Sequence, residues 1–82
     1  MQGTVAAKNK QLGLIAVEVK GHYSVFEILS GRDFEIGDQV LWDSDTKLGP
    51  QRITNYTQHW EQDVYFQSHY VSKNILEQQL SL

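Results

Sequence analysis

The feature that most constrains the fold is a pair of neighbouring segments, residues 14–20 and 23–29, in which apolar residues recur at every second position. The residues that share a face are Ile15, Val17 and Val19 in the first segment, and Ser24, Phe26 and Ile28 in the second. A period of two places alternate side chains on opposite faces, which is the pattern of a β-strand and not of a helix. The two residues between the segments, Gly21 and His22, predict a hairpin.

The rest of the chain alternates between short apolar runs and polar breaks. Further strands are predicted at residues 4–8, 39–42, 51–57 and 63–71. Ser72 is a suitable N-cap, and residues 73–80 then predict a short helix that must dock on other structure, because so few residues are not helical alone in water. We therefore expect an all-β fold: residues 1–57 form a five-stranded barrel, and residues 58–82 add a strand–helix extension that packs on the same domain.

Composition restricts the class of protein further. The chain has 82 residues, 7 Lys and Arg against 10 Asp and Glu, and no cysteine. The lack of cysteine excludes disulfides and thiolate metal sites and fits a reducing cytoplasm. We expect no membrane segment, because no apolar run approaches the ~20 residues that a membrane helix needs. The net charge of −3 is unlike that of a domain that binds nucleic acid through a basic stripe.

Spaced glycines, valines and turn residues in the first 57 residues resemble the pattern of cold-shock domains. The matching positions are Gly3-x-Val5, Asn9, Gly13 and Val17, then Phe34-x-x-Gly37-Asp38-x-Val40, and then Gly49-Pro50-Gln51. The resemblance implies an OB-type barrel, a class that binds single-stranded nucleic acid by stacking bases on exposed aromatic side chains.

The positions that carry stacking residues in that pattern hold other side chains here. They fall at Ala7, Lys8, Leu14, Ala16, Val25 and Glu27. Losing three or four base stacks costs on the order of 4–8 kcal/mol, so this face is not expected to bind bases. Instead, we expect an interaction face made of Ala7, Leu14, Ala16, Val25 and Glu27.

Two arrangements would remove this apolar face from water. In the first, the C-terminal strand and helix cover it with residues from the set Phe66, Tyr70, Ile75, Leu76 and Leu80. In the second, another polypeptide covers it, either a second copy of the chain or a different protein. Single-stranded nucleic acid is the alternative partner, and a relocated site for it would use Lys8, Lys10, Arg52, Tyr56 and Trp60.

Motifs that carry chemistry are not found in the sequence. His22, His59 and His69 do not have the spacing of metal ligands on a helix, and Asp43-Ser44-Asp45 lacks the glycine and glutamate that complete a calcium loop. We therefore expect no metal, no cofactor and no catalytic residues. The sequence predicts a cytoplasmic, non-enzymatic binding module whose partner is a protein or a second copy of itself.

Overall fold

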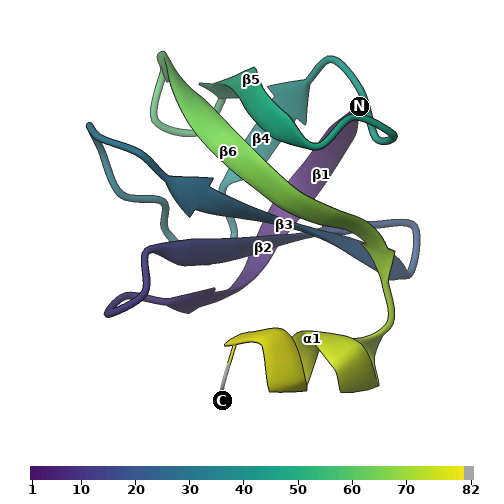
Figure 1. Ribbon diagram of the computed structural model, residues 1–82. Coiled ribbons are helices and arrows are strands. Elements are labelled where there is room, and N and C mark those ends of the chain that lie inside the picture. The colour runs from purple at the N-terminus through teal and green to yellow at the C-terminus, as the bar shows by residue number, and fades with distance from the viewer. Residues whose placement is uncertain (81–82) are drawn as a thin grey trace.

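The computed structural model describes residues 1–80 of the chain (Figure 1). Six strands precede one helix: β1 (Gln2–Asn9), β2 (Leu14–Val19), β3 (His22–Ile28), β4 (Gln39–Trp42), β5 (Gly49–Asn55), β6 (Trp60–Val71) and α1 (Lys73–Leu80). The bounds of β4 and α1 are those expected from the sequence, and the other strands differ by a few residues at their ends.

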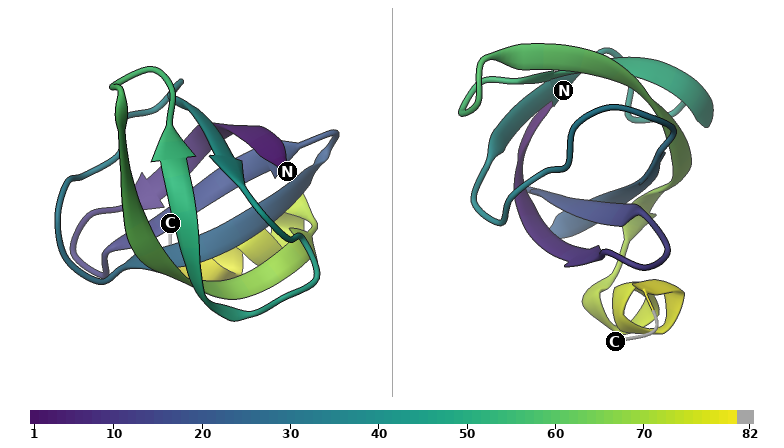
Figure 2. Two further views of the ribbon diagram at one scale, coloured as in Figure 1. Left: turned by 90° about the horizontal axis from the view of Figure 1, so that it is seen from above. Right: turned by 90° about the vertical axis from the view of Figure 1, so that its left-hand side faces the viewer.

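The strands form a closed barrel in the order β1-β2-β3-β6-β5-β4, and every neighbouring pair is antiparallel. The expected all-β barrel with a short C-terminal helix is thus confirmed, but the expected strand number of five is wrong. β6 is not outside the barrel, because it lies between β3 and β5 and pairs with β5 from Trp60 to Phe66 and with β3 from Val64 to Val71 (Figure 2). A five-stranded sheet without β6 would leave both neighbouring strands with unpaired backbone groups.

The barrel interior is filled by side chains from all six strands and from the loop between β3 and β4. Three phenylalanines meet there: Phe26 lies 4.9 Å from Phe34 and 5.3 Å from Phe66, between ring centroids. The other members are Val5, Ile15, Val17, Val40, Trp42, Ile53 and Val64. Trp42 is buried against Phe66, as its place in an apolar strand predicts.

A second apolar cluster lies outside the barrel wall, between β1–β3 and α1. It consists of Leu14, Ala16, Val25, Val71, Leu76 and Leu80. The view along the barrel in Figure 2 shows α1 beneath the strands, outside the ring that they form. β2 and β3 are therefore buried on both faces, since alternate residues point into the barrel and towards the helix.

The hairpin between β2 and β3 turns one residue earlier than predicted. Lys20 and Gly21 form the turn, with φ angles of 50° and 86°, and His22 already pairs with Val19. Positive φ at both central residues is the geometry of a type I′ turn, whose twist matches that of the flanking strands. This turn lies at the same end of the barrel as the loop between β4 and β5 and the end of β6.

Candidate functional site

The five residues of the predicted interaction face do lie together, across β1, β2 and β3. Ala7 pairs with Ala16, Ala16 with Val25, and Leu14 with Glu27. Three of them, Leu14, Ala16 and Val25, are buried, while Ala7 and Glu27 are half-buried. The C-terminal helix packs on four of these five residues, which we call the covered face (Ala7, Leu14, Ala16 and Val25), and this is the first of the two arrangements expected from the sequence. Glu27 lies beside it, next to Tyr65 on β6.

The cover uses fewer residues than that arrangement supposed. Leu76 and Leu80 supply it, together with Val71 at the end of β6. Phe66 belongs to the barrel interior, and Tyr70 and Ile75 are exposed. In α1, residues 76 and 80 are one turn apart and share a face, whereas residue 75 points elsewhere.

Polar contacts at its C-terminal end hold α1 in place. The side-chain amide of Asn9 donates a 2.7 Å hydrogen bond to the carbonyl oxygen of Leu80. Ser68 on β6 and Gln79 on α1 are also hydrogen-bonded, at 3.0–3.1 Å. At the start of the helix, the Ser72 carbonyl accepts a bond from Leu76, so the helix continues directly from the turn after β6. The helix is thus tied to β1 as well as to β6.

Two cations of the alternative nucleic-acid site, Lys8 and Arg52, form ion pairs with carboxylates of this chain. Lys8 Nζ lies 2.8 Å from Asp33 Oδ2, and this hydrogen bond raises the pKa of Lys8 and lowers the pKa of Asp33. Arg52 lies 3.4 Å from Asp63 and 3.2 Å from Glu61, and hydrogen bonds to these two groups raise the pKa of Arg52. Both cations are therefore already compensated by charges of this chain.

The remaining residues of that alternative site are only partly gathered. Trp60 packs edge-on against Phe34, with centroids 5.0 Å apart, and Lys8 donates a hydrogen bond to the Phe34 carbonyl. Trp60 and Lys8 thus meet around one residue. Tyr56 is exposed in the loop between β5 and β6, and Lys10 is exposed in the turn between β1 and β2. The structure does not form one continuous row of cations and aromatic rings from these residues.

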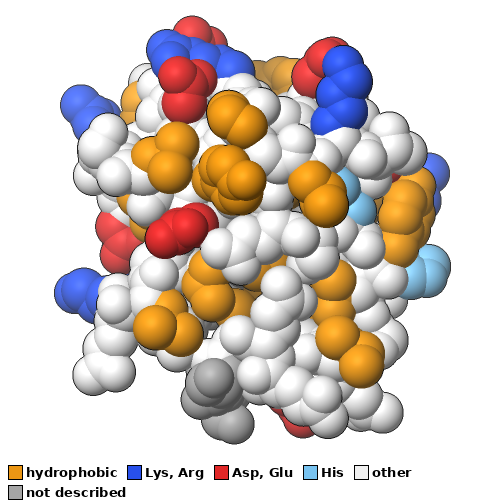
Figure 3. Space-filling view, in the orientation of Figure 1, with side chains coloured by type: hydrophobic (Ala, Val, Ile, Leu, Met, Phe, Trp, Pro, Cys, Tyr) orange, Lys and Arg blue, Asp and Glu red, His pale blue; other side chains and the backbone are white. Residues whose placement is uncertain are grey.

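An exposed face that the sequence analysis did not single out covers β5, β6 and the end of β3. Its centre is Tyr65, which is 43% exposed and pairs across the sheet with Pro50 on one side and Glu27 on the other. Leu29 and Leu48 are exposed in the adjoining loops. Figure 3 shows hydrophobic side chains gathered over β6, with charged groups mainly at the margins. The alternation of residues 63–71 was the signal, since Val64 and Phe66 point inwards and Tyr65 must point outwards.

One buried carboxylate organises the loops at the opposite end from the β2–β3 turn. Asp38 accepts hydrogen bonds from the Glu35 amide at 2.9 Å, the Asn55 side chain at 2.8 Å and the Gln58 side chain at 2.6 Å. Burial alone raises the pKa of Asp38, but these hydrogen bonds outweigh burial and hold the pKa below its ordinary value of 3.8. With all its donors inside the fold, Asp38 has a structural role.

Residues 1–80 contain no group of three or more His, Asp or Glu side chains placed to hold a metal ion. Within the same residues, no helix has the length and apolar character needed to cross a lipid bilayer. Comparison with protein-family models, with curated proteins and with solved structures gives no match. Any functional conclusion therefore depends on the surfaces of this chain.

Proposed function

We propose that this chain is a small, non-enzymatic binding module on an OB-like barrel, and that its partner is a polypeptide, either another protein or a second copy. The observation that carries the proposal is the Tyr65 face, by which we mean Leu29, Leu48, Pro50 and Tyr65. The face that corresponds to base binding under the proposed cold-shock resemblance carries α1, so we expect a partner to meet the molecule elsewhere. We place the module in the cytoplasm, as the lack of cysteine suggests.

The Tyr65 face has the make-up of a protein interface. Tyrosine is enriched among the residues that dominate binding energy, and effective interfaces have an apolar centre with a polar rim. Here the rim consists of Glu27 beside Tyr65, and of Arg52 paired with Asp63 one row further along the strands. The excess of carboxylates in this rim disfavours a phosphate backbone and is compatible with a polypeptide.

Self-association is the form of the proposal that can be tested without knowing a partner. Sedimentation velocity over a range of protein concentrations should show a reversible dimer that Tyr65→Arg dissociates. Tyr56→Arg is the matched control, because Tyr56 is similarly exposed but lies in the loop beyond this face. A dimer that both variants weaken equally would contradict the role of the Tyr65 face. A monomer would exclude the second copy and leave a different protein as the partner.

Single-stranded nucleic acid is the second candidate, because Lys8 and Trp60 both contact Phe34, and Lys10 is exposed in the turn that follows β1. A titration of a fluorescently labelled mixed-sequence single strand, followed by the anisotropy of the label, separates the two proposals. The polypeptide proposal predicts no saturable rise in anisotropy at moderate salt. A submicromolar complex that weakens steeply with salt, and that is lost in Trp60→Leu, would support the second candidate instead.

A further inference from the structure

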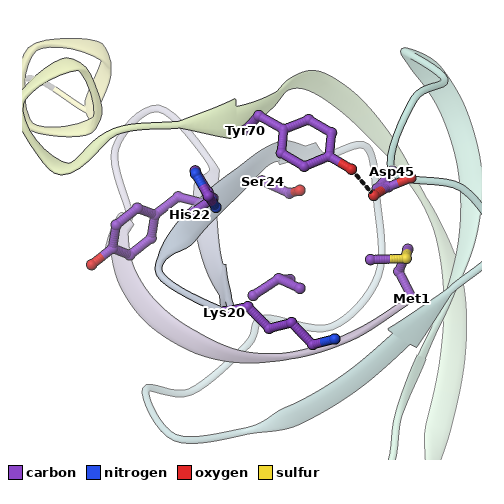
Figure 4. A pocket seen from close by; sticks show the side chains of 8 residues that line it. Met1, Lys20, His22, Ser24, Asp45 and Tyr70 are labelled. Carbon is purple, nitrogen blue, oxygen red and sulfur yellow. Dashed lines mark hydrogen bonds between the residues drawn. The ribbon is translucent and has the colours of Figure 1, made fainter.

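A cavity of about 320 Å³ opens at the end of the barrel where the β2–β3 turn, the β4–β5 loop and the end of β6 meet. Its volume falls in the range of small-molecule sites, which often occupy the mouths of β-barrels. Figure 4 shows Met1, Lys20, Ser24, Asp45 and Tyr70 arranged around the opening, from four different parts of the chain. The cavity is separate from both the covered face and the Tyr65 face.

Two residues that line this cavity have unusual backbone conformations. Among residues 1–80, the non-glycine residues with positive φ are Lys20 at 50°, His59 at 63° and Tyr70 at 56°. Left-handed conformations are uncommon for residues with bulky side chains, and they concentrate at ligand-binding and active sites. The conformation of Lys20 is that of the type I′ turn, and the turn and the end of β6 together place Lys20 and Tyr70 at the border of one cavity.

A β-bulge is the reason that Tyr70 faces the opening. Tyr23 pairs with Val71 and Val25 with Ser68, so three steps along β6 oppose two along β3. Bulges are common at barrel rims, where the extra residue re-aims a side chain. The Tyr70 hydroxyl donates a hydrogen bond to the Asp45 carboxylate, and its ring lies edge-on to His22 with centroids 5.8 Å apart. The ring is therefore held as a fixed wall of the cavity.

The cavity combines opposite charges with an apolar lining. Lys20 supplies a positive charge and makes no ion pair within residues 1–80, and Asp45 supplies a negative charge from the β4–β5 loop. The apolar part of the lining comes from the side chains of Met1 and Val19 and the ring of Tyr23, and the Met1 ammonium group, hydrogen-bonded to the Trp42 carbonyl, adds a second positive charge. We propose that this cavity binds a small zwitterion with an apolar body, of the size and chemistry of a free apolar amino acid: its carboxylate meets Lys20, and its ammonium group meets Asp45.

Ser24 supplies a further polar contact inside the cavity. Its hydroxyl lies 2.8 Å from His69 Nδ1, and His69 Nε2 lies 2.7 Å from the Lys47 carbonyl oxygen. Because a carbonyl only accepts, Nε2 carries the proton, and Nδ1 accepts the hydrogen of the Ser24 hydroxyl. The Ser24 oxygen then presents lone pairs to the cavity and can accept a second hydrogen bond from the ammonium group.

The test uses three probes that share a phenyl ring: L-phenylalanine, 3-phenylpropanoate, which lacks the ammonium group, and 2-phenylethylamine, which lacks the carboxylate. Titration of the isotope-labelled chain, followed by amide chemical shifts, gives both the affinity and the place of binding. We expect L-phenylalanine to bind with a Kd of about 1 mM, as suits so small a ligand. Each single-charge probe should bind about fivefold more weakly. The shifts should centre on Lys20, Ser24 and Tyr70.

Two variants assign the two charges, and a third is the control. Lys20→Asn keeps a turn-compatible residue and should weaken both carboxylate-bearing probes about fivefold without affecting 2-phenylethylamine. Asp45→Asn should weaken the two probes that carry an ammonium group, L-phenylalanine and 2-phenylethylamine, without affecting 3-phenylpropanoate. Lys10→Asn, in the turn at the opposite end of the barrel, is the control and should change nothing. The proposal is overturned if L-phenylalanine leaves the amides around the cavity unmoved, or if the Lys20 and Lys10 variants bind it equally.

Discussion

Truncation of Leu80 tests whether α1 is part of the cooperative fold. Leu80 is 0% exposed and Leu76 is 4% exposed, so both side chains lie fully within the second apolar cluster. Replacing a buried leucine by alanine removes its transfer free energy and leaves a cavity. Because α1 lies outside the barrel, where its neighbours can relax, we expect the lower part of the usual range, about 3 kcal/mol. For a domain of this size, that loss lowers Tm by roughly 12–24 °C.

The assay is urea denaturation followed by tryptophan fluorescence, which reports the barrel through the buried Trp42. The matched control is Ile75→Ala in the same helix, because Ile75 is 53% exposed and its truncation should cost less than about 0.5 kcal/mol. Equal costs for the two variants would refute the docking of α1 in solution. An unchanged barrel transition in Leu80→Ala would show that the helix detaches independently of the barrel.

Substitutions at three further positions test separate parts of the fold. Asp38→Ala should lower the free energy of unfolding by about 2–3 kcal/mol in denaturant titrations, since the fully buried Asn55 amide loses its acceptor. Because the pKa of Asp38 in the folded state lies below 3.8, its contribution to stability is complete above pH ~5 and is lost as the pH falls through the folded pKa. Stability measured from pH 6 to 2 should therefore fall less steeply in Asp38→Asn than in the wild type. Gly3→Ala should cost about 1–3 kcal/mol by thermal denaturation, because an added Cβ would lie 2.5 Å from Val17 Cγ1; no loss would mean that the strands separate easily there. Lys20→Asn should raise the free energy of unfolding by about 0.5–1 kcal/mol, since asparagine tolerates the left-handed conformation at φ 50° better than lysine; a loss instead would show that the lysine side chain contributes packing.

Local patterns were sufficient to predict most elements. Alternation predicted β2 and β3, and Ser72 followed by Ile75, Leu76 and Leu80 predicted α1, although Ile75 proves to be exposed. The number of barrel strands was not predictable in this way, because periodicity marks residues 63–71 as a strand but says nothing of its neighbours. The decisive facts are its pairings with β3 and β5, which join positions far apart in the chain.

Among the candidate sites, too, local patterns predict some features, and others depend on contacts between distant parts of the chain. The covered face could be predicted from alternate residues of β2 and β3, because the apolar character of Leu14 and Val25 requires a cover. The barrel-end cavity was not predictable, since Lys20, Asp45 and Tyr70 carry no common motif and meet only after barrel closure. The carboxylates that compensate Lys8 and Arg52 were equally hidden, because each ion pair joins residues on different elements or loops.

Closure of the barrel also limits how this chain can meet others. Every strand from β1 to β6 has hydrogen-bonded neighbours on both sides. An incoming extended peptide therefore finds only short unpaired stretches, such as residues 67–71 of β6 on the side away from β3, and stacking of copies into a continuous cross-β ribbon would first require a strand pair to separate. Recognition by this molecule is therefore expected to depend on side chains and on the shape of its surface more than on strand addition.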